Sequence, residues 1–133
     1  MFSEISAINY WAVLIASLSI FALGGLWYSP KVFGGIWQRE AQLLSKETHP
    51  AKVFITSFVF ALIAAFAFAL LVGPHPGLNT ALLKGAIVGI LVATSFGINY
   101  QFGNRGIKLL LIDGGYHFIQ FLIYGLVFGL ASS

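Results

Sequence analysis

The stretch from Val53 to Val72, VFITSFVFALIAAFAFALLV, contains no charged residue, no glycine and no proline. An α-helix rises about 1.5 Å per residue, so a run of this length spans the hydrocarbon core of a bilayer, which is about 30 Å thick. The run stops at Gly73-Pro74-His75-Pro76-Gly77, where prolines and glycines end a helix. The stretch therefore predicts a membrane-spanning helix.

Three other stretches have the same apolar character. The four segments cover about residues 8–28, 53–72, 78–100 and 108–130. Inside hydrocarbon, each backbone N–H and C=O group must bond within its own segment, so all four are predicted to be helices. The predicted fold class is an all-α integral membrane protein, a four-transmembrane-helix bundle that forms one domain over residues 1–133.

The composition limits the classes of function. Of the 133 residues, 59% are hydrophobic and 8% are charged, whereas a soluble domain has about 25% charged residues. The net charge is +3, but the cations do not form the cluster that a nucleic-acid-binding face requires. No cysteine is present, which excludes disulfides and thiol chemistry. Asp113 with His117 supplies at most two ligands, fewer than zinc needs, so we expect no metal site. We also expect no cofactor and no nucleic-acid partner.

The basic residues indicate the orientation. Six of the seven lie in or beside the first and third loops: Lys31, Arg39, Lys46, Lys52, Arg105 and Lys108. Cytoplasmic loops carry an excess of Lys and Arg, so we expect a multi-pass protein of the plasma (inner) membrane with both termini outside the cytoplasm. Lys84, about 9 Å inside the outer end of the third helix, is close enough to extend its ammonium group outward. Trp27 and Tyr28 fit an aromatic belt at the inner boundary.

The first loop, residues 30–52, has a pattern of its own. Phe33, Ile36, Trp37 and Leu44 recur near helical spacing. The pattern fits a short helix lying in the cytoplasmic interface, and it also fits a loop that its aromatic residues anchor. Both interpretations stay open at the level of sequence.

Three segments carry a resemblance to a known family. They are INYWAV at residues 8–13, GGLWYSPKVFG at 24–34 and LIDGGYH at 111–117. With these segments the chain resembles domain-of-unknown-function family 1761 over nearly its whole length, and Trp-Tyr-Ser-Pro is the most specific part. The resemblance implies a small, mostly bacterial, four-helix membrane protein without an assigned activity. It supplies no catalytic residues to transfer.

A polar stripe on the fourth helix is the candidate functional site. Asp113, His117, Gln120 and Tyr124 fall at i, i+4, i+7 and i+11, which is one helix face. Counted from Lys108, Asp113 lies about 8 Å and His117 about 14 Å inside the hydrocarbon. Placing an aspartate at the centre of a helix costs about 2.5–3.5 kcal/mol. We therefore expect the stripe to face protein or water.

Two interpretations of the stripe compete. As a structural network it would join helices through hydrogen bonds worth about 0.6 kcal/mol each on average. As a functional site it would be linked to a proton or a ligand, because histidine titrates near neutral pH and Asp113 could hold the tautomer of His117. We favour the functional interpretation. On the third helix, Ser95 and Asn99 share a face that could meet the stripe, with a hydrogen bond from Asn99 to Asp113.

Small residues recur at every fourth position of the last two helices. They are Gly85, Gly89, Ala93 and Gly97 on the third helix and Gly125 and Gly129 on the fourth. Such spacing lets helix backbones pack closely in lipid. The close contact is either internal to the bundle or between subunits, and we expect a homo-oligomer because four helices leave little room for a pathway inside one protomer.

Three classes of function remain, and we rank them. The first is transport or permeation of a small solute or ion along the polar stripe. The second is a structural or interaction subunit of a membrane complex, docked through its glycine faces. The third is a lipid-modifying enzyme that uses Asp113 and His117 as an acid–base pair. The enzyme is ranked last because the sequence offers no evident nucleophile, metal or second acid.

Overall fold

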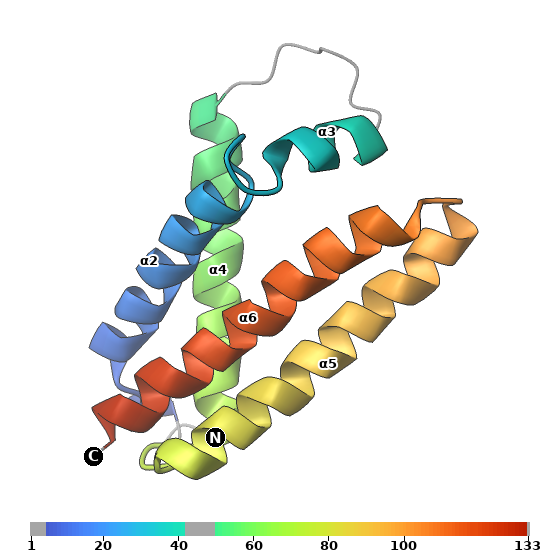
Figure 1. The fold of residues 1–133 in the computed structure, drawn as a ribbon. Coiled ribbons are helices and arrows are strands. Elements are labelled where there is room, and N and C mark those ends of the chain that lie inside the picture. Colours follow the sequence, from blue (N-terminus) through green and yellow to red (C-terminus); the bar gives the residue numbers. More distant parts are fainter. Residues whose placement is uncertain (1–4, 42–49, 133) are drawn as a thin grey trace.

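The computed structural model describes residues 5–41 and 50–132, and its principal elements are five helices. They are α2 (Tyr10–Trp27), α3 (Gly34–Ala41), α4 (Pro50–Val72), α5 (Leu78–Phe102) and α6 (Ile107–Ala131). All except α3 are long and apolar enough to cross a membrane (Figure 1). The predicted fold class, an all-α bundle of four long apolar helices, is confirmed.

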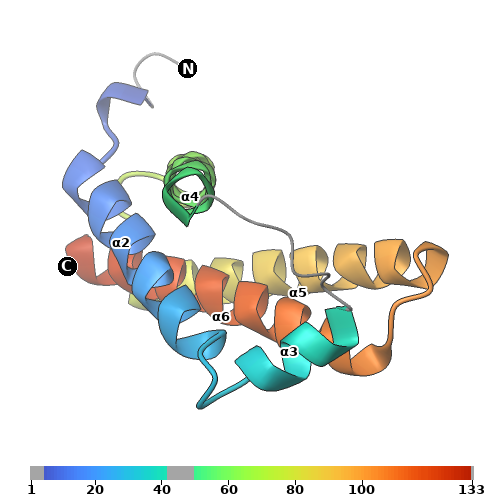
Figure 2. The ribbon, with the colours of Figure 1, turned by 90° about the horizontal axis from the view of Figure 1, so that it is seen from above.

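The four long helices are not mutually parallel. Helices α5 and α6 form an antiparallel hairpin with the most extensive contact between any two of the described helices, while α2 packs against both α4 and α6. Figure 2 shows α4 almost end-on, with α5 and α6 lying across the view. The hairpin thus crosses α4 obliquely. We call the end of the bundle that carries α3 and the 103–106 turn the α3 end, and the opposite end the 73–77 end.

The hydrophobic core fills the half of the bundle nearer the 73–77 end. Small residues at the contact of α2 with α4, such as Ala16 and Ala65, are fully buried. Phe68 of α4 lies against Phe121 and Phe128 of α6, with ring centroids 6.0–6.1 Å apart. Such close packing is what holds helices together in lipid, where apolar burial from water is absent. The half nearer the α3 end is packed differently and holds the polar residues.

A tight connection leads from α2 into α3. Phe33 N–H donates to the Trp27 carbonyl at 3.1 Å, and Gly34 N–H donates to the Ser29 carbonyl at 2.8 Å. A side chain at Gly34 would place its Cβ 2.3 Å from the Tyr28 carbonyl oxygen, so only glycine fits there. The connection turns the chain back over α6, and α3 contacts α6.

The short helix that the first loop's pattern suggested is present as α3. Its Trp37 ring lies against Tyr28, with centroids 5.4 Å apart. The remaining residue of that pattern, Leu44, lies outside the described residues, as does Lys46 of the same loop. At the opposite end, the Lys84 ammonium donates to the Leu71 carbonyl of α4 at 3.2 Å.

Candidate functional site

Asp113 of α6 lies where three parts of the chain meet. The Tyr28 hydroxyl, directly after α2, donates to Oδ1 of Asp113 at 2.5 Å. The Tyr100 hydroxyl, near the end of α5, donates to Oδ2. Each carboxylate oxygen therefore has one tyrosine donor, and hydrogen bonds to an ionised acceptor are roughly twice as strong as those between neutral groups.

Aromatic rings surround this carboxylate. Tyr116 of α6 lies 5.4 Å from Tyr28 and 5.0 Å from His117, measured between ring centroids. Phe96 of α5 lies 5.0 Å from His117 and 6.0 Å from Tyr100. Asp113 therefore lies in largely aromatic surroundings.

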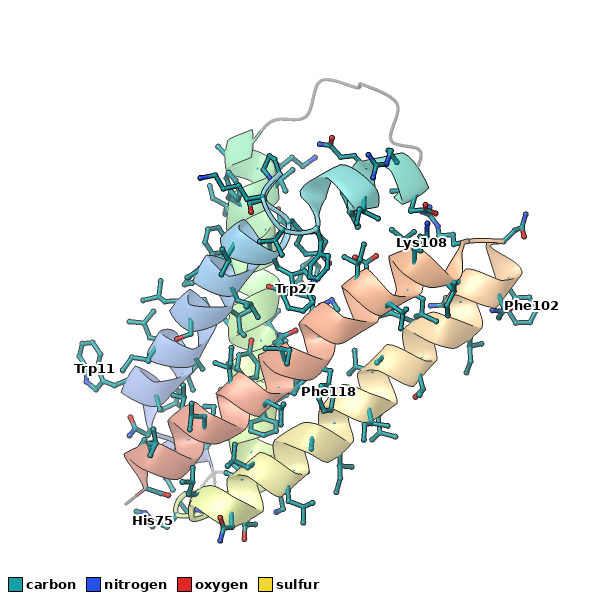
Figure 3. The ribbon with its side chains drawn as sticks, in the orientation of Figure 1. Trp11, Trp27, His75, Phe102, Lys108 and Phe118 are labelled. Carbon is teal, nitrogen blue, oxygen red and sulfur yellow. The ribbon has the colours of Figure 1, made fainter. Side chains whose placement is uncertain are left out.

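The Trp-Tyr pair at residues 27 and 28 positions this half of the site. Trp27 Nε1–H donates to the Ile112 carbonyl at 2.9 Å, directly beside Asp113. Gly24 and Gly115 allow this approach, since a Cβ at Gly24 would lie 3.1 Å from the Tyr116 hydroxyl and one at Gly115 would lie 3.4 Å from the Trp27 ring. Figure 3 shows Trp27 directed from α2 toward α6. The segments 24–34 and 111–117 are thus in contact.

The match to a family of proteins covers both of these segments. The model of DUF1761, described as a protein of unknown function, matches residues 11–129. The chain belongs to the DUF1761 family. No curated protein and no solved structure matches it. In this DUF1761 protein, the Trp27–Pro30 segment therefore contacts the helix that carries Asp113.

The rest of the stripe forms a chain of hydrogen bonds that leads away from Asp113 into the core. His117 Nδ1 lies 2.5 Å from Gln120 Oε1, and Gln120 Nε2–H donates to the Tyr124 hydroxyl at 3.0 Å. The Tyr124 hydroxyl donates to the Ala61 carbonyl of α4 at 2.9 Å. Gln120 is 5% exposed and Tyr124 is 0% exposed. Gln120 and Tyr124 are therefore buried, and the chain of hydrogen bonds joins α6 to α4.

The acceptor at the end of this chain of hydrogen bonds determines which atom carries each proton in the chain. The Ala61 carbonyl can only accept, so Tyr124 must donate to it and accept from the amide of Gln120. The amide oxygen of Gln120 then faces His117, so Nδ1 of His117 must carry the proton. Nε2 is left as the nitrogen that can accept a proton or a hydrogen bond. The partner that orients His117 is therefore Gln120, and the expectation that Asp113 holds its tautomer is wrong.

Ser95 and Asn99 lie on α5 beside a hollow of about 240 Å³. Leu91, Val92 and Phe96 complete its lining. Both polar side chains are exposed, and Ser95 donates to the Leu91 carbonyl of its own helix at 2.7 Å. In the described part of the chain, Asn99 makes no hydrogen bond to Asp113, and the neighbouring Tyr100 donates instead. Phe96 connects this hollow to the site, because it lines the hollow and its ring also lies against His117.

The regularly spaced small residues lie along the contact of α5 with α6. A Cβ at Gly85 would lie 2.3 Å from the Phe121 carbonyl oxygen, and one at Gly125 would lie 2.4 Å from the Ala81 carbonyl oxygen. Gly89 faces Phe118, and Gly129 faces Leu78. Ala93 faces Gly114 at 3.4 Å, whereas Gly97 has only an ordinary contact with Leu110. Most of these small residues thus let the backbones of α5 and α6 approach each other closely within the hairpin.

Sequence reasoning missed the two tyrosines that bind Asp113. Tyr28 was assigned to an aromatic belt, and Tyr100 was given no role. A signal for both exists in the sequence, because Gly25-Leu26-Trp27-Tyr28 and Gly97-Ile98-Asn99-Tyr100 each lie near the end of a helix that runs toward the α3 end. Two tyrosines at one depth beside an intramembrane aspartate are a pattern that could have predicted the pair.

Proposed function

We propose that this DUF1761 protein transports a small cation, or a small solute together with a proton, and that Asp113 is the group that binds the charge. The observation that carries the proposal is the lack of a basic partner. Asp113 is the one acidic residue in α2, α4, α5 and α6. Within residues 5–41 and 50–132, its hydrogen-bond partners are the neutral hydroxyls of Tyr28 and Tyr100.

The energetics of this arrangement favour a binding role. Tyrosine hydroxyls are protonated at neutral pH, so both can stabilise an ionised carboxylate, by about 1.5–3 kcal/mol for each hydrogen bond. They offset the cost of placing the acid in the membrane, which is about 2.5–3.5 kcal/mol. They do not neutralise its charge. A site that holds a negative charge without compensating it attracts a cation, and a proton can also neutralise it.

Access to the site is proposed to come from the α3 end. The α4 half nearer that end, residues 51–60, is almost entirely exposed, and the part of α5 nearer the same end carries Ser95 and Asn99 beside the hollow. Toward the 73–77 end, the buried Gln120 and Tyr124 close the way. Transport would then require α4 to move relative to α6, because the hydrogen bond from Tyr124 to Ala61 spans the closed part.

The orientation and the assembly belong to the same proposal. We propose that the α3 end lies in the cytoplasm of a plasma (inner) membrane, with both termini outside, because the cations of the first and third loops favour this orientation. The site then opens toward the cytoplasm in this conformation. A homo-oligomer is proposed because the buried interior of one protomer offers no continuous path. The transport path would then lie between the moving helices of neighbouring copies.

One observation favours the second function, a structural or interaction subunit. The chain of hydrogen bonds from His117 to Ala61 is complete and needs no ligand. This candidate would have to dock its partner through a surface other than Gly85, Gly89, Gly125 and Gly129, whose Cβ positions the hairpin occupies. A lipid-modifying enzyme remains the third candidate, without a nucleophile beside His117 to support it.

Cation flux into proteoliposomes tests the transport proposal. The wild-type chain is reconstituted into vesicles that enclose a pH-sensitive dye, and a potassium diffusion potential, negative inside, is applied with valinomycin. We expect internal acidification, or uptake of labelled methylammonium, to be faster than in protein-free vesicles. Equal rates with and without protein for both probes would contradict transport of a cation.

Water accessibility along the stripe gives a second, independent prediction. The chain has no native cysteine, so Ser95→Cys, Asn99→Cys and His117→Cys can each be probed with a membrane-impermeant thiol reagent. We expect these positions to react from the α3 end, and Gln120→Cys and Tyr124→Cys to stay unreactive because both sites are buried.

Leu122→Cys serves as the matched control, since Leu122 lies on α6 outside the polar stripe. Reaction limited to one side of the membrane also tests the orientation. Labelling at Gln120→Cys and Tyr124→Cys equal to that at His117→Cys would mean a continuous hydrated pore. Silence at all of these positions would mean a closed network and would favour the structural subunit.

A further inference from the structure

A second concave surface lies on the α5–α6 hairpin, apart from the polar site. It is an apolar groove of about 630 Å³. Gly97, Gly114 and Ala93 line it with almost no side-chain volume, and larger apolar side chains form its walls: Ile90, Ile98, Leu110, Leu111 and Phe118. Figure 3 shows Phe118 between α5 and α6 at about the middle of the hairpin. Ile90, Ile98 and Leu111 are more than half exposed, so the groove opens away from the protein.

The groove has the length of one membrane leaflet. It extends along α5 from Ile90 to Gln101, which is about 16 Å at 1.5 Å per residue. Half of a hydrocarbon core of about 30 Å is about 15 Å. Its lining near the middle of the hairpin is apolar apart from Thr94, whose hydroxyl donates to the Ile90 carbonyl of its own helix at 2.8 Å. Gln101 lies at the end next to the 103–106 turn.

Two cations lie at that end of the groove. Lys108 is exposed and lies on the same face of α6 as Leu111 and Gly115, three and seven residues further along. Arg105 is exposed in the turn, with its guanidinium carbon 6.0 Å from the centre of the Tyr100 ring. Neither cation forms an ion pair within residues 5–41 and 50–132, although Glu40 lies close to Gly106. Figure 3 shows Lys108 at the turn end of the hairpin.

We propose that this groove binds an anionic phospholipid, with one acyl chain along the glycines and the phosphate at Lys108 and Arg105. The apolar length matches a leaflet, and the positive charge lies at the depth of the headgroups. A second copy of the chain fits the same surface poorly. A two-fold axis along the membrane normal would bring Lys108 and Arg105 of both copies together, and like charges that face each other oppose association.

Native mass spectrometry of the full chain in detergent, titrated with dioleoyl phosphatidylglycerol or dioleoyl phosphatidylcholine, tests the proposal. We expect phosphatidylglycerol to bind more tightly than phosphatidylcholine. Lys108→Gln should weaken phosphatidylglycerol binding about 5-fold, and Lys108→Gln with Arg105→Gln about 30-fold, from the effect of each cation at an anionic headgroup. Gly97→Leu should weaken binding of both lipids, because Gly97 has only an ordinary contact with Leu110 and a larger side chain there extends into the groove.

The chain offers matched controls for both substitutions. Lys52→Gln removes an exposed cation of α4, and Gly25→Leu adds the same side chain to α2, where nothing lies within 4 Å of a Cβ. Neither should change lipid binding. Equal affinity of the wild type for the two lipids, or lipid binding that Gly97→Leu leaves unchanged, would overturn the proposal. A Gly97→Leu chain that loses a dimer while it keeps its lipid would assign the groove to a protein interface instead.

Discussion

Alanine in place of Gly125 is expected to lower the free energy of unfolding by about 1–3 kcal/mol, the usual cost of overpacking. The added Cβ would lie 2.4 Å from the carbonyl oxygen of Ala81 and 3.1 Å from the Cα of Leu82. Both atoms belong to the α5 backbone, which cannot rotate away as a flexible side chain could. The two helices would have to separate along their length. Thermal unfolding of the purified protein in detergent measures the effect.

Two other glycines provide controls for this substitution. A Cβ at Gly97, in the same hairpin, would meet only the Leu110 side chain at 3.7 Å, and a Cβ at Gly25 of α2 would meet nothing within 4 Å. Gly97→Ala and Gly25→Ala should therefore keep or raise the stability, since alanine favours a helix over glycine by about 1 kcal/mol. Equal unfolding temperatures for Gly125→Ala and Gly25→Ala would contradict the close packing of α5 on α6.

The sequence alone was enough for the fold class and for the family. Long uncharged runs such as Val53 to Val72 carry a signal that does not depend on tertiary contacts, because hydrocarbon itself selects helices. The alignment of Asp113, His117, Gln120 and Tyr124 along one face follows from the helical period, which is equally local. Each of these features depends on a single segment of the chain, and helical geometry determines it.

The partners of the stripe could not be derived in the same way. Whether Asn99 or Tyr100 reaches Asp113 depends on the rotation of α5 about its own axis, and adjacent residues point about 100° apart at 3.6 residues per turn. Close contacts at Gly85 and Gly89 set that rotation, and the sequence does not state which helix they face. The donor from Tyr28 spans 85 residues and depends on the tight connection at Gly34. Long-range packing, rather than local propensity, therefore determines which side chains donate hydrogen bonds to Asp113.

The residues that stabilise the bundle and the residues of the candidate site lie in different halves of the bundle. The half nearer the 73–77 end holds the apolar core and the buried Tyr124, which hydrogen-bonds to Ala61. The half nearer the α3 end holds Asp113, His117 and the aromatic rings. Among the described elements, α3, the α5–α6 hairpin and the end of α2 lie around them. A change at Asp113 can therefore alter a bound charge without disturbing the packing that holds the four helices together.

Asp113→Asn is accordingly expected to reduce cation or proton flux to the rate of protein-free vesicles while the protein stays folded. The amide has the shape of the carboxylate and can still accept from one tyrosine, while its NH₂ group can donate to the hydroxyl oxygen of the other. The change weakens two charge-assisted hydrogen bonds and also removes the cost of placing a carboxylate in the membrane. These effects oppose each other, so the unfolding temperature should change little. The lost property is the negative charge itself, and with it the affinity for a cation or a proton.

Tyr28→Phe tests the hydrogen bond to the carboxylate separately from the charge of the carboxylate. This variant removes the donor to Oδ1 but leaves the carboxylate and the bond from Tyr100, so we expect a reduced flux that is still above the rate of protein-free vesicles. The dye assay and a thermal unfolding curve on the same preparations measure both properties for both variants. Flux that survives Asp113→Asn would remove Asp113 from the transport pathway. A large drop in unfolding temperature for Asp113→Asn, equal to that for Gly125→Ala, would instead mean that the carboxylate serves to hold α2, α5 and α6 together.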